Sequence, residues 1–118
     1  MEIGEKLIYW AVERNIKSQP VSRNGLCANI TEELGEWLNA FDENDEHEKV
    51  DALADIVVFA MVEMTKMRYH PDKVMIEAHK EINSRTGAWD ENIQKWVKNK
   101  SPEAKKLWYK ADFSDCKI

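Results

Sequence analysis

Apolar residues recur at helical spacing over the first 86 residues of the chain, and this pattern predicts four helices. The segment "SQPVSRNG" breaks the pattern after the first helix, because proline and glycine end helices. Gly87 has the position of a glycine that follows the last turn of the fourth helix. The predicted helices cover about residues 3–17, 26–41, 46–67 and 71–86.

The second and third predicted helices carry the clearest apolar stripes, which we expect to form the core. A short polar link, "DENDEHE", joins the two helices, so they should form an antiparallel hairpin. The stripe of the second helix consists of Leu26, Ile30, Leu34, Trp37, Leu38 and Phe41. The stripe of the third helix consists of Val50, Leu53, Ala54, Val57, Met61 and Met64.

The pattern weakens after Gly87. "AWDENIQKWVK" fits either a small β-hairpin or an irregular loop, whereas "SPEAKKLWYK" predicts a short helix at about 102–110, with serine as its N-cap and proline in its first turn. The predicted fold is therefore all-α: a single domain over 1–118, with a four-helix bundle-like core at about 3–86 and a basic, aromatic C-terminal extension at 87–118.

Composition and charge exclude several classes of function. No apolar run approaches the roughly 18 residues that span a bilayer, and "MEIGEKLIYW" lacks a signal-peptide pattern, so we expect a cytoplasmic protein with no membrane partner. The net charge of −5 argues against a dedicated nucleic-acid binder.

Three glutamates crowd into just over one helical turn in "ITEELGEWLNAF", although like charges at this spacing repel one another. Projection at about 100° per residue places Glu33 and Glu36 together on one flank of the apolar stripe. Glu32 falls on the opposite side, towards solvent. Two of the three glutamates therefore border the predicted core.

The third helix carries a matching set of acids. Asp51 and Asp55 share one flank of the stripe, with Glu48 one turn earlier. Asp55 is surrounded by apolar residues in "ALADIVVFA", and burial of an unpaired carboxylate costs several kcal/mol, so such groups are normally paired or metal-bound. In a hairpin this flank faces Glu33 and Glu36, so four carboxylates converge and a cation must hold them together. Oxygen ligands without His or Cys suit Mg²⁺, with Mn²⁺ as a possible substitute.

Other metal motifs do not fit the sequence. "HEKVD" begins like the zinc motif HExxH but ends in aspartate, and "DENDEHEKVDAL" lacks the glycine and the final glutamate of an EF-hand. No histidine follows a glutamate at the Glu-x-x-His spacing of di-iron bundles.

"EELGEW" followed by "EKVDALADIVVFAM" resembles the MazG-like all-α nucleoside triphosphate pyrophosphohydrolases, which share an E-x-x-E … E-x-x-D metal motif. The resemblance covers about residues 5–86. It implies hydrolysis of a nucleoside triphosphate, often a deoxy one, to the monophosphate and pyrophosphate with Mg²⁺. By this likeness Glu33 and Glu36 are the first metal-binding pair and Asp55 is the final aspartate, with Glu33 or Glu36 also holding or deprotonating the attacking water.

The second half of the motif departs from the family pattern, because Ala52 stands where E-x-x-D places glutamate. Asp51, one turn from Asp55, is the favoured substitute, as in a phage-like variant with D-x-x-x-D. In the alternative register, Glu48 and Asp51 form the E-x-x-D pair. In the favoured register, Glu48 and Glu32 do not bind the metal ion directly but support the residues that do.

Cationic residues must complete a site that binds a triphosphate. "HKEINSRTG" offers Lys80, Asn83 and Arg85 as phosphate ligands, and Lys110 in "LWYK" would close over the nucleotide. Trp10 is a candidate for stacking on the base. Lys80 is explained equally well as a solvated residue at a helix end, where a positive charge suits the helix dipole. Trp10 is explained equally well by ordinary core packing.

Two other functions remain open at the level of sequence. Ala52 is compatible with a non-catalytic, regulatory nucleotide-binding protein, and the acidic helices are compatible with an interaction module for a basic partner. Mostly by resemblance, we expect a homodimer or homotetramer.

Overall fold

The computed structural model describes residues 1–118, which divide into two compact units. The first unit comprises residues 1–72 together with Ile118, and the second comprises Lys73–Lys117. The structure is predominantly helical, which confirms the all-α prediction. In chain order the elements are α1 (Ile3–Glu13), α2 (Arg23–Asp42), α3 (Glu46–Lys66), α4 (Pro71–Asn83), β1 (Gly87–Asp90), β2 (Lys95–Lys98), α5 (Pro102–Lys105) and a 3₁₀ turn at Ser114–Cys116.

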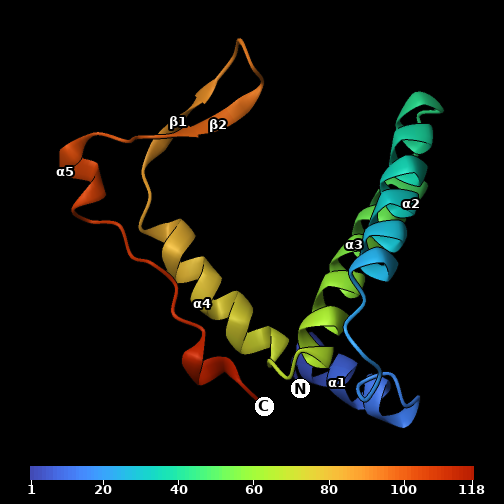
Figure 1. The fold of residues 1–118 in the computed structure, drawn as a ribbon. Coiled ribbons are helices and arrows are strands. Elements are labelled where there is room, and N and C mark those ends of the chain that lie inside the picture. The colour runs from blue at the N-terminus through green and yellow to red at the C-terminus, as the bar shows by residue number, and fades with distance from the viewer. The chain divides into compact units, whose positions relative to one another are not determined.

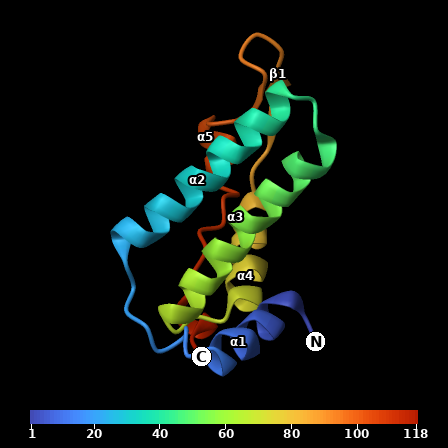
Figure 2. The same cartoon turned by 90° about the vertical axis from the view of Figure 1, so that its right-hand side faces the viewer.

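Helices α2 and α3 form the predicted antiparallel hairpin and lie side by side in both views (Figure 1 and Figure 2). Each helix begins at a side-chain cap. The Ser22 hydroxyl accepts a hydrogen bond from the Gly25 amide at 3.0 Å, and the Asp45 carboxylate accepts one from the Glu48 amide at 3.1 Å. Asn44, with a φ of 57°, makes the left-handed turn between the helices.

Helix α1 packs against α3 and is anchored by a residue distant in sequence. The Asp72 carboxylate accepts hydrogen bonds from the Gly4 and Glu5 amides, each at 2.9 Å, and so caps the first turn of α1. A Cβ atom at Gly4 would lie 2.4 Å from Asp72 Oδ1, so the cap requires glycine at this position. Helix α1 ends at Glu13, earlier than the predicted residue 17.

The seam between α2 and α3 differs from the predicted stripes. Ala40 and Ala52 are buried, whereas most of the expected core residues remain exposed. Both helices carry apolar residues on more than one face, and periodicity alone does not determine which of them meets the partner helix. The exposed residues are Leu34, Leu38 and Phe41 of α2 and Val50, Leu53 and Val57 of α3, with 48–65% of each accessible, together with Ala54 of α3.

The second unit contains most of α4, the β-hairpin and the C-terminal segment. Strands β1 and β2 pair antiparallel, with Trp89 opposite Trp96. The segment "AWDENIQKWVK" is therefore a β-hairpin rather than an irregular loop. Gly87 begins β1 and does not terminate α4, so the prediction for this glycine was wrong. Helix α5 is shorter than expected, and its cap is the Ser101 hydroxyl, which accepts from the Ala104 amide.

Residues 108–112, here called the C-terminal strap, are tied to α4 by carboxylates. Glu77 accepts hydrogen bonds from the Tyr109 hydroxyl and the Asp112 amide, and the Ala111 amide donates to Glu81 at 3.0 Å. The Tyr109 hydrogen bond, more than any other contact, lowers the pKa of Glu77 to about 2. None of the helices is long and apolar enough to span a membrane.

Candidate functional site

Three carboxylates lie at the seam between α2 and α3, and we call them the acidic seam: Glu33 and Asp55, which are half-buried, and Glu36, which is exposed but shares a hydrogen bond with Glu33. Burial, a hydrogen bond with Glu36 and the negative charges of Glu36, Asp55 and Glu32 together raise the pKa of the Glu33 carboxyl to about 7, with burial as the largest cause. Glu33 Oε2 is buried and has no hydrogen-bond partner. Such an oxygen is destabilising unless a proton or a cation reaches it.

Local structure explains why these side chains meet. Glu33 and Glu36 are three residues apart on α2 and therefore share one face. Asp55 is half-buried on α3, one turn after Ala52, which is 1% exposed. Position 52 thus faces the hairpin interior, and the glutamate of an E-x-x-D motif there would enter the seam. Alanine leaves that place without a ligand.

The other acids predicted from sequence lie outside the seam. Asp51 and Glu48 are exposed and, unlike the equally exposed Glu36, do not contribute to the raised pKa of Glu33. Glu32 is exposed, as the helical projection predicts, but its charge reaches Glu33. The structure therefore gathers three of the four predicted metal ligands and leaves Asp51 beside them at the surface.

The acidic seam fits a hard divalent cation by its chemistry. Its donors are carboxylate oxygens, one of which is buried without a partner. As the side chains stand, no three His, Cys, Asp or Glu residues are grouped closely enough to hold a metal ion. Holding one requires rotation of these side chains towards a common point.

The cationic candidates of the second unit are engaged with nearby groups. Lys80 pairs with Glu77 at 3.1 Å. The Arg85 guanidinium lies 4.0 Å from the ring centroid of Trp108 and 3.7 Å from the Glu81 carboxylate. Asn83 and Lys110 are exposed. Any phosphate bound by Lys80 or Arg85 would compete with these carboxylates.

Trp10 lines a cavity of about 250 Å³ within the first unit, together with residues of α2 and α3. Asn29, on its α2 side, is one turn before Glu33, and Val58 and Val62, on its α3 side, follow Asp55 by one and two turns. The cavity is therefore next to the acidic seam along both helices.

Sequence reasoning missed Glu63, which lines the same cavity and pairs with Lys66. The signal was present, because Glu63 interrupts the apolar run "VVFAMVEM" just as Asp55 interrupts "ALADIVVFA".

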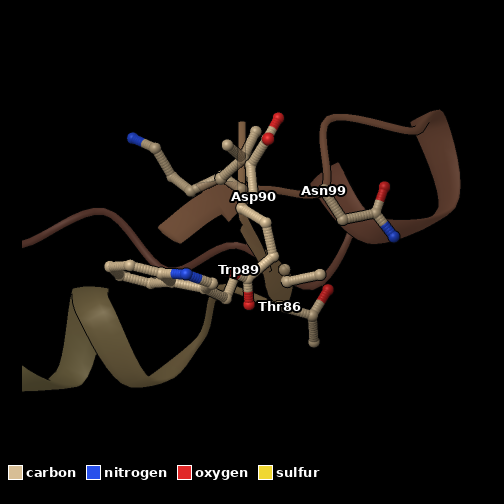
Figure 3. Close-up of a pocket in the computed structure, with 9 residues that line it drawn as sticks. Thr86, Trp89, Asp90 and Asn99 are labelled. Carbon is tan, nitrogen blue, oxygen red and sulfur yellow. The ribbon is translucent and has the colours of Figure 1, made fainter. Parts of the chain in front are cut away.

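A larger hollow of about 630 Å³ lies against the β-hairpin, where Thr86, Trp89, Asp90 and Asn99 surround it (Figure 3). It is open to solvent and brings together no buried, unpartnered acid of the kind found in the seam. Size alone does not make it the better candidate.

An all-α chain with glutamates and an aspartate facing each other across a helical hairpin has the features of the MazG-like pyrophosphohydrolase superfamily. The chain belongs to the phosphoribosyl-ATP pyrophosphohydrolase family, whose sequence profile matches residues 11–82, more than half of its length. No curated protein and no solved structure matches the chain significantly. The matched range contains the whole acidic seam, as well as Ala52 and Glu63.

Proposed function

We propose that the protein is a cytoplasmic, Mg²⁺-dependent enzyme that hydrolyses a nucleoside or deoxynucleoside triphosphate to the monophosphate and pyrophosphate. The observation that carries the proposal is the buried, unpartnered Oε2 of Glu33 beside Glu36 and Asp55. Membership in a family of pyrophosphohydrolases supports the same bond specificity. The proposed partner is the small-molecule substrate, rather than a nucleic acid or a membrane.

Glu33, Glu36 and Asp55 would hold the cation, with Asp51 rotating inward as the fourth ligand of the phage-like D-x-x-x-D variant. When bound, Mg²⁺, or Mn²⁺ in its place, neutralises charge that develops on the phosphate oxygens and helps to orient the attacking water. Aspartate at 51 is one turn from Asp55, so both side chains can reach the same end of the seam. Glu48 and Glu32 would act on the ligands through their charge.

Glu33 or Glu36 would take the proton from the attacking water. The water oxygen bonds to phosphorus while the bond to the bridging oxygen breaks, and pyrophosphate leaves with the electron pair of that bond.

Lys80, Asn83, Arg85 and Lys110 remain the proposed phosphate ligands, and Trp10 the proposed base ligand. For Lys80 and Arg85, phosphate binding would exchange one anionic partner for another, since both already pair with carboxylates. The cavity at Trp10 supports the proposal for the base, because it adjoins the acidic seam.

A homodimer or homotetramer would explain the exposed apolar face of the hairpin. Leu34, Leu38 and Phe41 on α2 and Val50, Leu53 and Val57 on α3 are each about half exposed or more. Contiguous apolar faces of this kind are typical of protein interfaces, and a second copy presents the same face.

One observation favours a second candidate function. Ala52 faces the seam without supplying an oxygen, so the chain could bind nucleotides without cleaving them. An acidic interaction module is less well supported, because a docking surface for a basic partner does not require a buried, partnerless carboxylate.

Product analysis tests the proposal and separates these functions. The purified protein is incubated with each of the common ribo- and deoxynucleoside triphosphates and Mg²⁺, and pyrophosphate and orthophosphate are quantified. A pyrophosphohydrolase releases pyrophosphate and no orthophosphate. Binding without product indicates the regulatory function, and orthophosphate as the sole product contradicts the proposed bond specificity.

A further inference from the structure

The C-terminal strap is anchored directly after Trp108. The Tyr109 amide donates a hydrogen bond to Ser84 Oγ at 2.8 Å, and the Tyr109 hydroxyl donates to Glu77. The Trp108 indole has no such anchor, because its Nε1 is buried without a hydrogen-bond partner. Rotation of this side chain can therefore move the indole while the backbone beside it stays bound to α4.

The indole covers the guanidinium of Arg85, whose Cζ lies 4.0 Å from the ring centroid. The Arg85 side chain is 15% exposed, and its Nε is buried without a hydrogen-bond partner. Its Nη2 is 3.7 Å from the Glu81 carboxylate, which is too far for a hydrogen bond. A buried guanidinium whose donors lack acceptors is destabilising, so this closed position of the indole is not an optimal state for Arg85.

Two further cations lie close to Arg85. Lys105 Nζ is 5.8 Å from the centroid of the Trp108 ring, so Arg85 and Lys105 approach the same ring. Arg85 also lines a hollow of about 250 Å³ together with Lys98 and one acid, Glu81. Three cations against one carboxylate attract anions, and a polyphosphate has enough charged oxygens to contact more than one of the cations.

The geometry of arginine explains why the indole has to move. Nε and Nη2 form a planar fork that binds a phosphate through two parallel hydrogen bonds. In Arg85 the Nε end of this fork is buried, and the ring of Trp108 lies over the guanidinium. A phosphate can therefore use both ends of the fork only after the indole has left Arg85.

We propose that Trp108 is a gate over a phosphate-binding site formed by Arg85, Lys98 and Lys105, and that the indole leaves Arg85 when a diphosphate or triphosphate group binds. Residues 109–112 keep their hydrogen bonds to α4 while the gate opens. This inference rests on the proposed function, in which Arg85 binds a phosphate of the substrate. It adds two lysines to that site, and it implies that the indole competes with phosphate and lowers its affinity.

Binding of inorganic anions tests the gate without hydrolysis. Inorganic triphosphate, which represents the substrate, and pyrophosphate, the product, are titrated calorimetrically into the protein without Mg²⁺, so that neither binds through a cation at the acidic seam. Trp108→Ala should bind both anions at least about fivefold more tightly than the wild type, because a cation–π contact no longer competes. Leu107→Ala is the matched control, since Leu107 precedes the gate and is 76% exposed, and it should keep the wild-type affinity. The anion that binds more tightly identifies whether the substrate or the product occupies the site.

Charge variants test the residues of the site. Arg85→Gln should lower the affinity at least about tenfold, the loss typical of a charge-assisted hydrogen bond. Lys98→Gln and Lys105→Gln should each lower it about threefold, as expected of more exposed cations. Lys106→Gln is the control, because Lys106 is exposed and is not one of the cations at the Trp108 ring, and its affinity should stay close to that of the wild type.

Fluorine NMR follows the indole itself. In protein labelled with fluorinated tryptophan, the resonance of Trp108 is assigned by its loss in Trp108→Phe. A saturating concentration of the anion should shift this resonance, because the ring leaves the guanidinium. The resonance of Trp37, which belongs to the first unit, should stay unchanged.

Unchanged or weaker anion binding by folded Trp108→Ala, a Trp108 resonance that does not move, or absence of anion binding by the wild-type protein would each overturn the inference. Circular dichroism checks the fold, and Trp108→Phe, whose smaller ring should give an intermediate affinity, replaces the alanine variant if that variant does not fold. Pyrophosphate release from nucleoside triphosphates with Mg²⁺ is measured in parallel for the wild type. Release without gating retains the proposed function and overturns the gate. Gating without release retains the gate and overturns the pyrophosphohydrolase proposal.

Discussion

Glu33 combines features that a purely structural residue rarely has. It is half-buried, one of its oxygens has no partner, and it has other carboxylates beside it. Each of these features disfavours the charged form, which is why the pKa of Glu33 rises to about 7. At pH 8 the metal-free fold therefore contains a charge that weakens it, and a cation that binds this charge would stabilise the protein.

The first prediction concerns this stabilisation. Mg²⁺ should raise the melting temperature of the wild-type protein at pH 8, since binding to the folded state at about 100 times Kd contributes about 2.7 kcal/mol. Glu33→Gln should melt at or above the wild-type temperature without metal and gain little from Mg²⁺. Glu43→Gln is the control, because Glu43 is exposed and does not act on Glu33, and it should respond to Mg²⁺ like the wild type. A full Mg²⁺ response in Glu33→Gln would contradict the assignment.

The second prediction decides the fourth ligand. If Asp51 replaces the glutamate that Ala52 lacks, Asp51→Asn should raise the Mg²⁺ concentration needed for half-maximal activity at least about tenfold. Glu48→Gln should have a mild effect, because Glu48 is nearly two turns from Asp55 and its side chain leans towards the start of α3. Activity is measured against Mg²⁺ concentration for both variants. A large loss in Glu48→Gln with Asp51→Asn nearly intact would instead favour the Glu48–Asp51 register.

At the scale of elements, periodicity and the polar link predicted helices α2 and α3 and the hairpin between them. The caps at which these helices begin, Ser22 and Asp45, are seen in the structure and do not follow from periodicity. The buried line of the hairpin could not be predicted in the same way, because apolar residues occupy several faces of each helix. The position of Glu33 beside Asp55 was predictable, since it depends on the hairpin rather than on the choice of stripe.

Contacts between segments that are distant in the chain could not be predicted from the sequence. The C-terminal strap is attached to α4 through Glu77, whose carboxylate accepts from both the Tyr109 hydroxyl and the Asp112 amide. No periodic pattern specifies such contacts, because they are made by single side chains across many residues.

The third prediction uses the strap. The pKa of Glu77 is lowered from 4.5 to about 2, so its contribution to stability is fully present above about pH 4.5 and is lost as the pH falls towards 2. Tyr109→Phe removes the largest cause of the shift and should reduce the loss of stability between pH 5 and about pH 3. Urea unfolding followed by tryptophan fluorescence measures this loss, with Tyr9→Phe as control. An identical pH dependence in Tyr109→Phe and the wild type would show that the hydrogen bond does not stabilise the strap.

At the scale of the whole molecule, the hairpin face formed by Leu34, Leu38, Phe41, Val50, Leu53 and Val57 is the feature that most requires explanation. Residues of α2 at i, i+4 and i+7 and of α3 at i, i+3 and i+7 form continuous stripes. Two copies can bury these stripes against each other, which is the basis of the proposed homo-oligomer.

The fourth prediction tests this assembly. Leu38→Glu combined with Val57→Glu should convert a dimer or tetramer into a monomer, because it places charges within an apolar interface. Light scattering coupled to size-exclusion chromatography measures the mass, and circular dichroism checks that the helices are retained. Val21→Glu is the control, since Val21 is 54% exposed but lies outside this face. A wild-type protein that is monomeric at all concentrations would contradict the proposal.

The most direct test of the central claim is pyrophosphate release by Asp55→Asn with Mg²⁺ and the preferred triphosphate. Asparagine keeps the volume of the side chain but removes a charge from the acidic seam, so the account predicts a folded protein whose kcat/KM is at least about a hundredfold lower than that of the wild type. Asp42→Asn, at an exposed position near the end of α2, should retain wild-type activity. Turnover by folded Asp55→Asn at the wild-type rate would contradict the account.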